Sequence, residues 1–309
     1  MEQQITYINK GISSYYSAFT IDVEDGINIS MRDNFKVEMD PTSRVVDNVK
    51  VILDICERNQ VRGTFFILGE IAEFYPGLIK EIHSKGHEIG VHGYHHDQIF
   101  RLDPDSLRIE LSKAKDLLED LTGNEVKGFR APAFSINQKT SWALQVIARC
   151  GFKYDSSIYP SLSLRYGWKN FSKNICELQL DDQTKLVEVP LSVVRFLGRD
   201  IPVCGGGYLR YFPYSITRNA IRTIKKERPA IVYLHPYELD TKKYPGYFHD
   251  AISRAPLKTK LPLSIYRYKK ATVKPKLEKI TKEFRFMPLI EIIQNLEKTN
   301  QVPVYTIQL

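Results

Sequence analysis

Residues 90–97, GVHGYHHD, contain three histidines within five positions, at the end of the apolar run HEIGV. His92 and His96 are four positions apart, so on one helical turn, or on a loop that enters one, both imidazoles can point the same way. His95 could replace His96 but would leave a less regular face. Two surface histidines would show the same spacing, so the pattern needs a third ligand before it predicts a metal site.

Three acidic residues at the end of another apolar run are candidates for that ligand. The segment TIDVEDG (20–26) contains Asp22, Glu24 and Asp25. Carboxylates at the buried end of an apolar strand need a positive partner, and a metal ion is one. The alternative is a solvated turn whose acid caps a following helix. Two histidines and one carboxylate leave a position on zinc for water, which is the catalytic arrangement.

Two further segments place single polar residues after apolar runs. GFRAPAF (128–134) puts Arg130 at a strand end, before a proline that fixes the loop, although a surface salt bridge would look the same. YLHPYELD (233–240) puts His235 directly after AIVYL. A histidine in this position has few structural uses, so His235 is a candidate general acid.

The elements that must position these residues alternate along the chain. Over roughly the first 160 residues, apolar runs alternate with amphipathic stretches, which predicts βαβ units and a parallel sheet. Strands are expected at 17–23, 62–68, 87–92, 126–132, 152–157, 185–191 and 230–236, and helices at 43–59, 70–86, 103–123, 137–151 and 288–299. Polar residues follow the strands, and in a parallel α/β barrel these ends share one mouth, where active sites form. These residues are Asp22, His92, Arg130, Asp155 and His235.

The composition is that of an ordinary globular protein with 309 residues, enough for one large domain or two small ones. The four cysteines are widely spaced and form no CxxC pair, which excludes a disulfide framework and a thiolate zinc site. No apolar signal core and no apolar stretch near 20 residues is present. We therefore expect a cytoplasmic protein that binds no nucleic acid.

Taken in order, five segments resemble the motifs of the polysaccharide deacetylase family, carbohydrate esterase family 4. They are FTIDVED, HGYHH, FRAPAF, YDSSIYP and YLHP. The resemblance covers most of the chain and implies a metal-dependent hydrolase of the α/β class, on a distorted (β/α) barrel of about seven parallel strands. It implies one catalytic domain over residues 1–309, with a basic helical C-terminal extension from about 255 to 309.

A closer resemblance is to the branch of this family associated with bacterial exopolysaccharide and surface-glycan gene clusters. The shared segments are DVED, GRDIPVCGGGYLRYFPY (198–214) and HPYELD. This resemblance implies a role in the biosynthesis of a surface glycan, with a polysaccharide, an oligosaccharide or a lipid-linked precursor as the substrate.

The resemblance also implies a role for each site residue. Asp22 matches the catalytic base of the family, and Arg130 matches the arginine that holds this base. His92 and His96 match the two metal histidines, and His235 matches the catalytic acid. The implied cofactor is one divalent metal, with Zn²⁺ favoured and Co²⁺, Ni²⁺, Mn²⁺ or Fe²⁺ as alternatives.

The first motif departs from the pattern of the family. Many members have two adjacent aspartates, the second of which binds the metal, but here Val23 follows Asp22. The third metal ligand must then be Glu24, which fits the D-x-acid form of some relatives, or Asp25, which has the usual shorter side chain. Both stay open at the level of the sequence.

Four residues are candidates for contact with substrate. A backbone N–H near Ala133, next to Phe134, would help the metal to hold the oxyanion. The segment CGGGYLRY (204–211) has three glycines that allow close backbone approach. It is either a tight turn or a loop that lines the sugar site with Tyr208 or Arg210.

The expected activity is removal of an N-acetyl group from an amino sugar. Alternatives with the same site are a deformylase and a hydrolase of small amides or ureides. A catalytically inactive glycan-binding module is the alternative of another class, but it would need neither the base Asp22 nor the acid His235.

The net charge of +8 admits an anionic partner, and residues 258–285 are rich in lysine. This region is either a solvated helical face or a surface that docks peripherally on the anionic inner membrane.

Overall fold

In the computed structural model, the described part of the chain comprises residues 16–161, 167–260, 263 and 268–307. Its strands are β1 (Ser17–Val23), β2 (Thr64–Ile67), β3 (Glu88–Val91), β4 (Gly128–Phe129), β5 (Tyr154–Asp155), β6 (Cys176–Gln179), β7 (Lys185–Glu188), β8 (Val193–Phe196), β9 (Arg199–Pro202), β10 (Ile231–Leu234), β11 (Phe286–Met287) and β12 (Val304–Thr306). All except β8 and β9 belong to one sheet, which is the framework of the fold.

Seven strands of this sheet run parallel, in the order β10-β1-β2-β3-β4-β5-β7. Beyond them, β6 pairs antiparallel with β7, β12 pairs with β6, and β11 pairs with the start of β1. Within the described residues no ladder joins β10 to β7 or β12, so the sheet stays open on that side. β8 and β9 form a separate antiparallel hairpin.

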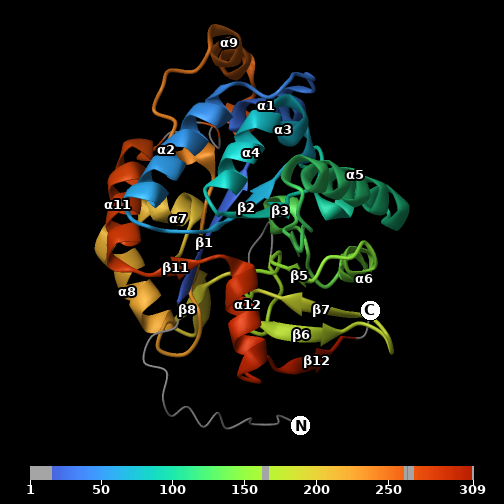
Figure 1. The fold of residues 1–309 in the computed structure, drawn as a ribbon. Helices are drawn as coiled ribbons and strands as arrows, with labels where there is room; N and C mark the ends of the chain where they lie inside the picture. Colours follow the sequence, from blue (N-terminus) through green and yellow to red (C-terminus); the bar gives the residue numbers. More distant parts are fainter. Residues whose placement is uncertain (1–15, 162–166, 261–262, 264–267, 308–309) are drawn as a thin grey trace.

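The helices surround this sheet (Figure 1), with α2, α8 and α11 on one side of the view and α5 and α6 on the other. Their bounds are α1 (Gly26–Phe35), α2 (Arg44–Arg58), α3 (Gly69–Phe74), α4 (Pro76–Ser84), α5 (Pro104–Thr122), α6 (Trp142–Arg149), α7 (Gly206–Tyr211), α8 (Tyr214–Ile224), α9 (Gly246–Arg254), α11 (Val273–Glu283) and α12 (Leu289–Lys298). Short 3₁₀ turns include η2 (Pro132–Phe134) and η3 (Pro236–Glu238).

The apolar periodicity explains how these elements pack. Every residue of β1, β2 and β10 is buried, as expected for strands covered on both faces. In α2 the buried apolar residues recur at helical spacing: Val45, Val49, Ile52, Leu53 and Cys56. The main core cluster contains residues from Phe19 to Phe286, so the two halves of the chain share one core.

The prediction of a single helix at 70–86 is wrong in one respect. The structure has two helices there, α3 and α4, separated at Tyr75. Pro76 has no backbone N–H to continue the first helix, but it fits the first position of the second. The break keeps α3 short, directly beside the loop that carries the histidines, where the backbone N–H of Gly69 donates to the carbonyl of Gly93.

Candidate functional site

The carboxyl ends of the parallel strands bring the predicted polar residues together. Asp22 lies at the end of β1, and His92 directly follows β3. Arg130 directly follows β4, and His235 directly follows β10. Because β10, β1, β2, β3 and β4 are neighbours in this order, all four residues lie at one edge of the sheet.

Glu24, His92 and His96 form a compact group of potential metal ligands. Oε2 of Glu24 lies 2.8 Å from Nε2 of His96 and 3.5 Å from Nε2 of His92. One ligand atom from each residue falls within 4.8 Å of the other two. Oε2 of Glu24 is buried and has no hydrogen-bond partner among the described residues. A divalent cation would satisfy it, so these residues fit a metal.

The backbone orients one of these histidines. Nδ1 of His92 lies 2.8 Å from the carbonyl oxygen of Arg130, so Nδ1 carries the proton and donates it. The lone pair of Nε2 then faces Glu24, as in metal-binding histidines held by a second hydrogen bond. Burial would raise the pKa of Glu24, but the neighbouring His96 and His235 outweigh it and hold that pKa well below its usual range.

His96 reaches the group from a loop and not from a helix. Its φ is +65°, in the left-handed region, and residues 92–98 are not helical. The helical reading of the four-residue spacing is therefore wrong, and the loop reading applies. His95 points elsewhere, since its half-exposed ring places Nδ1 3.3 Å from Oε2 of Glu70.

Asp25 has a different place from Glu24. It is the N-cap of α1, and its carboxylate accepts from the backbone N–H of Ile27 at 3.0 Å and of Thr42 at 2.5 Å. The helix-capping alternative considered for this segment thus applies to Asp25. Its carboxylate is engaged by the backbone, whereas that of Glu24 faces the histidines.

Asp22 and Arg130 form a buried ion pair, with 2.7 Å between Oδ1 of Asp22 and Nη1 of Arg130. The guanidinium also donates to the hydroxyls of Thr20 and Ser156 and to the carbonyl of Ser156, and it lies over the ring of Phe66. This network fixes the rotamer of Arg130 and, through it, the orientation of Asp22. The second oxygen of Asp22 remains directed toward His235.

His235 lies close to the carboxylates of both Asp22 and Glu24. Its Nε2 lies 3.7 Å from Oδ2 of Asp22 and 3.8 Å from Oε1 of Glu24. The ring of Tyr237 stacks on it, with centroids 5.0 Å apart and planes 17° apart. Burial would lower the pKa of His235, but the carboxylates of Glu24, Glu238 and Asp22 outweigh it and raise that pKa to about 9. The arrangement can therefore supply a carboxylate to accept a proton and an imidazolium to donate one.

The expected substrate contacts occupy two places. Ala133 and Phe134 in η2 both have positive φ, +53° and +51°, a strained conformation that is concentrated at functional sites. The ring of Phe134 is buried edge-on against Tyr159 and Tyr233. In α7, Tyr208 is half-buried beside Phe212. Contact of these residues with a substrate stays a prediction.

Arg210 of α7 is buried, and its Nε lies 3.3 Å from Oε1 of Glu238. Glu238, which the sequence reasoning missed, in turn approaches the ring of His235, with 3.6 Å between Oε2 and Nδ1. The segment HPYE could have identified Glu238 from the sequence, because a tight turn that starts with proline brings residues three positions apart onto one side.

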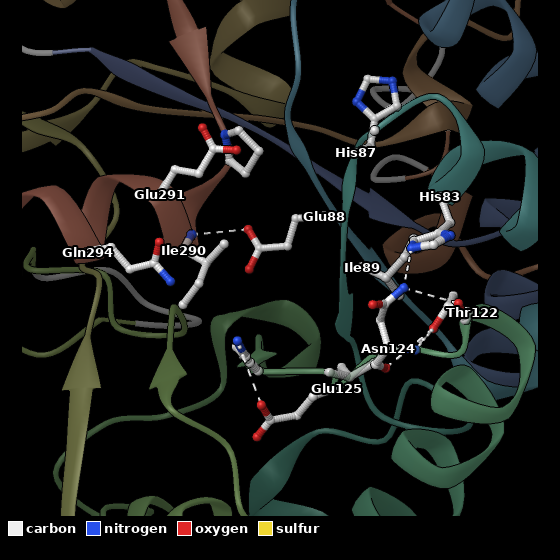
Figure 2. Close-up of a pocket in the computed structure, with 14 residues that line it drawn as sticks. His83, His87, Glu88, Ile89, Thr122, Asn124, Glu125, Ile290, Glu291 and Gln294 are labelled. Carbon is white, nitrogen blue, oxygen red and sulfur yellow. Dashed lines mark hydrogen bonds and ion pairs between the residues drawn. The ribbon is translucent and has the colours of Figure 1, made fainter.

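A separate pocket of about 240 Å³ lies at the opposite ends of the strands (Figure 2), near the start of β3. Its half-buried Glu88 accepts from the hydroxyls of Thr64 and Tyr154 and from the backbone N–H of Ile290. Asn124 is paired with His83. The hydrogen bond between Glu88 and Ile290 thus joins the start of β3 to α12.

Two further observations concern the whole chain. Among the residues that the structure describes, no helix is both long and apolar enough to cross a membrane. All four cysteines lie in the described part of the chain, and all are free.

Two family models match adjacent parts of the chain. Residues 38–154 match the model described as polysaccharide deacetylase. Residues 156–294 match a model described as a domain of unknown function, DUF3473. The first match contains His92, His96 and Arg130, and the second contains Arg210, His235 and Glu238.

Curated relatives match part of the chain. A peptidoglycan-N-acetylglucosamine deacetylase of Bacillus cereus is 36% identical over 95 residues, which are 30% of this chain and 34% of that protein. A peptidoglycan deacetylase of Helicobacter pylori is 28% identical over 152 residues, which are 45% of this chain and 50% of that protein. In these two matches the chain spans about a third and a half of the length of the relative.

Solved structures match nearly the whole chain. A proposed polysaccharide deacetylase from Mycobacterium smegmatis superposes with a TM-score of 0.64 at 22% identity, over 99% of this chain and 97% of the other. The Puue allantoinase superposes with a TM-score of 0.60 at 16% identity, over 94% of this chain and 92% of the other. The predicted α/β fold of the distorted (β/α)-barrel type is therefore confirmed.

Proposed function

From the support that the matched model and relatives give for the polysaccharide deacetylase family, we propose that this chain is a metal-dependent hydrolase that removes an N-acetyl group from an amino sugar. The observation that carries this proposal is the buried group of Glu24, His92 and His96, flanked by Asp22 and His235. A carboxylate base and a histidine acid beside a metal site are the groups that amide hydrolysis requires.

Glu24, His92 and His96 would hold the divalent cation. When bound, the metal would lower the pKa of a water to about 7 and polarise the carbonyl of the substrate. Zn²⁺ is the proposed ion, because two histidines and one carboxylate are a common ligand set of catalytic zinc. Asp25 is excluded from this set in our proposal, since its carboxylate caps α1.

Side chains of the protein carry out the two proton transfers of the reaction. Asp22 takes a proton from the attacking water, while Arg130 holds its carboxylate in the required orientation. His235 gives the proton on Nε2 to the nitrogen of the leaving amine as the C–N bond breaks. The strained backbone at Ala133 is proposed to help hold the developing oxyanion. The products are acetate and a free amino sugar.

Release of acetate from N-acetylated amino sugars tests the activity. The purified chain, loaded with Zn²⁺, is expected to release acetate and expose a primary amine. Formate release from an N-formyl sugar, or turnover of a small ureide without acetate release, would favour the alternative hydrolases that use the same site. Substrate binding without turnover by the metal-loaded chain would favour the inactive glycan-binding module.

Metal content tests the ligand set. The His92→Ala/His96→Ala variant is expected to lose the metal, while His95→Ala serves as the matched control and keeps it. Glu24→Gln is expected to weaken metal binding strongly, whereas Asp25→Asn keeps the stoichiometry and lowers only stability. Unchanged metal content in the double histidine variant would refute the assignment.

The context of the reaction is part of the proposal. We place the protein in bacterial surface-glycan biosynthesis, in the cytoplasm, with one catalytic domain over residues 1–309. The four free cysteines support a reducing compartment, and the shared core supports one domain. The segment from about 255 to 309, expected as an extension, contributes β11 and β12 to the sheet.

Peripheral contact with an anionic membrane is also proposed, through the lysine-rich region 258–285. Two exposed apolar side chains lie in or beside it, Leu257 at 78% and Tyr268 at 54% exposure. Sedimentation with vesicles that contain anionic lipid, but not with neutral vesicles, would support this contact. Part of the region is outside the described residues, and part of it packs α11 onto the core.

A further inference from the structure

We propose that Arg210 and Glu238 form a buried positioning pair that holds His235 in the orientation needed to protonate the leaving amine. The inference rests on the proposed function and deepens it. The inference also assigns a role to the segment that matches the domain of unknown function, since that segment, residues 156–294, contains Arg210, His235 and Glu238.

Glu238 is placed to contact His235 by a short turn. Pro236 starts η3, and the turn brings Oε2 of Glu238 to 3.6 Å from Nδ1 of His235. The same oxygen accepts from the backbone N–H of His235 at 3.3 Å. Glu238 thus contacts both the backbone and the ring of the proposed acid, on the side away from Asp22.

Burial makes Arg210 necessary to this arrangement. Glu238 is 1% exposed and Arg210 is 4% exposed. A buried carboxylate without a cationic partner is strongly unfavourable, and removal of one member of such a pair leaves the other uncompensated. Nε of Arg210, 3.3 Å from Oε1 of Glu238, is this partner, so the carboxylate is held in place beside His235.

The backbone around α7 explains how Arg210 reaches this position. Gly205 pairs with Tyr233 of β10, and a Cβ on Gly205 would lie 2.3 Å from the carbonyl oxygen of Tyr233. Gly206 has a φ of +52° and also lies against Tyr233. The glycines of CGGGYLRY therefore bring the start of α7 against the strand that ends at His235.

The other end of α7 is fixed by a lysine of α11. Nζ of Lys276 donates to the carbonyls of Leu209, Arg210 and Phe212, at 2.9, 3.1 and 2.9 Å. Orphan carbonyls at a helix C-terminus are stabilised by such a cation. Lys276 belongs to the basic region, so at least one of its lysines positions α7.

The consequence for the reaction concerns one proton. Nδ1 of His235 lies 3.6 Å from Oε2 of Glu238, while the proton on Nε2 moves to the amine nitrogen as the C–N bond breaks and an N–H bond forms. Displacement of an acid by about 1 Å costs on the order of 100-fold in rate. The pair should therefore matter most for leaving groups that need protonation.

The experiment compares two substrates in the metal-loaded enzyme. Glu238→Gln keeps the shape of the side chain, and we expect kcat for an N-acetyl amino sugar to fall about 10- to 100-fold with KM nearly unchanged. Hydrolysis of an aryl acetate, whose phenolate leaves without an acid, should change less than about threefold. Arg210→Met should show the same pattern, and Arg210→Lys should recover part of kcat.

Matched controls separate this role from simple destabilisation. Arg218→Met removes an exposed partner of Glu283 and should leave both reactions unchanged. Metal content and melting temperature are measured for every variant. Equal losses on amide and ester, a loss confined to KM, or an unchanged kcat for the amide in Glu238→Gln would overturn the proposal. Wild-type protein that releases no acetate from any N-acetyl amino sugar would instead overturn the proposed function.

Discussion

At the scale of single residues, the directions in which Asp22, Glu24 and Asp25 project determine which of these carboxylates reaches the histidines. Asp22 and Glu24 are two positions apart, and in an extended segment such residues project to the same side. Asp25 projects to the other side and caps α1. The sequence predicted the residue types and their place at the strand ends. The sequence left Glu24 and Asp25 open because the backbone contacts that engage Asp25, from Ile27 and Thr42, are visible only in the fold.

The role of Asp22 can be separated from that of the metal ligands. Asp22→Asn is expected to keep the metal, since the potential ligands are Glu24, His92 and His96. Turnover should fall by about 10²- to 10⁴-fold, because an amide cannot act as the base. Metal analysis and initial rates on the same preparation check this. Near-normal turnover with the metal in place would contradict the assignment.

At the scale of elements, the regular βα alternation was predictable, whereas two helices in the second half of the chain were not. Strands such as β1 and β10 were recognised by their apolar runs, bounded by polar residues. Helices α7 and α8 were not expected, and α7 owes its position to tertiary contacts: the glycines against Tyr233 and the lysine at its C-terminus. Local sequence patterns do not contain such contacts, which is why the ion pair of Arg210 with Glu238 was not expected.

The close approach of α7 and β10 leads to a prediction for stability. Gly205→Ala would place a Cβ 2.3 Å from the carbonyl oxygen of Tyr233, so the backbone must shift. Overpacking of this kind costs about 1–3 kcal/mol. Gly246→Ala, at the start of α9, has open space around the added Cβ and is the control. Chemical denaturation should show a lower free energy of unfolding for Gly205→Ala only.

At the scale of the whole molecule, buried ionisable groups make stability depend on pH in two directions. Burial lowers the pKa of His87 to about 4, and the imidazole accepts from the backbone N–H of Gly63. Burial also raises the pKa of Asp155, to about 6, beside a buried Glu188. The folded state thus resists protonation at His87 and favours it at Asp155.

The contribution of His87 has a definite sign. Its pKa is about 4 in the fold and 6.5 ordinarily, so between these values the unfolded chain binds more protons. This contribution is complete above pH 6.5 and is lost as pH falls toward 4. His87→Asn should therefore lose less stability than wild type between pH 7 and pH 5. Urea denaturation at both pH values measures the difference, with a substitution of the exposed His249, His249→Asn, as control. Equal losses of stability in wild type and His87→Asn would contradict the prediction.

The pairing of β1 with β10 also determines when the site can form during synthesis. A separation of 212 residues lies between Thr20 and Val232, which are hydrogen-bonded across these neighbouring strands. The strands from β1 to β5 follow one another along the chain and can pair as they leave the ribosome, whereas β1 must wait for β10. Asp22 and His235 therefore meet only after β10 and His235 have been made, and a nascent chain that stops before β10 has the histidine group but no acid.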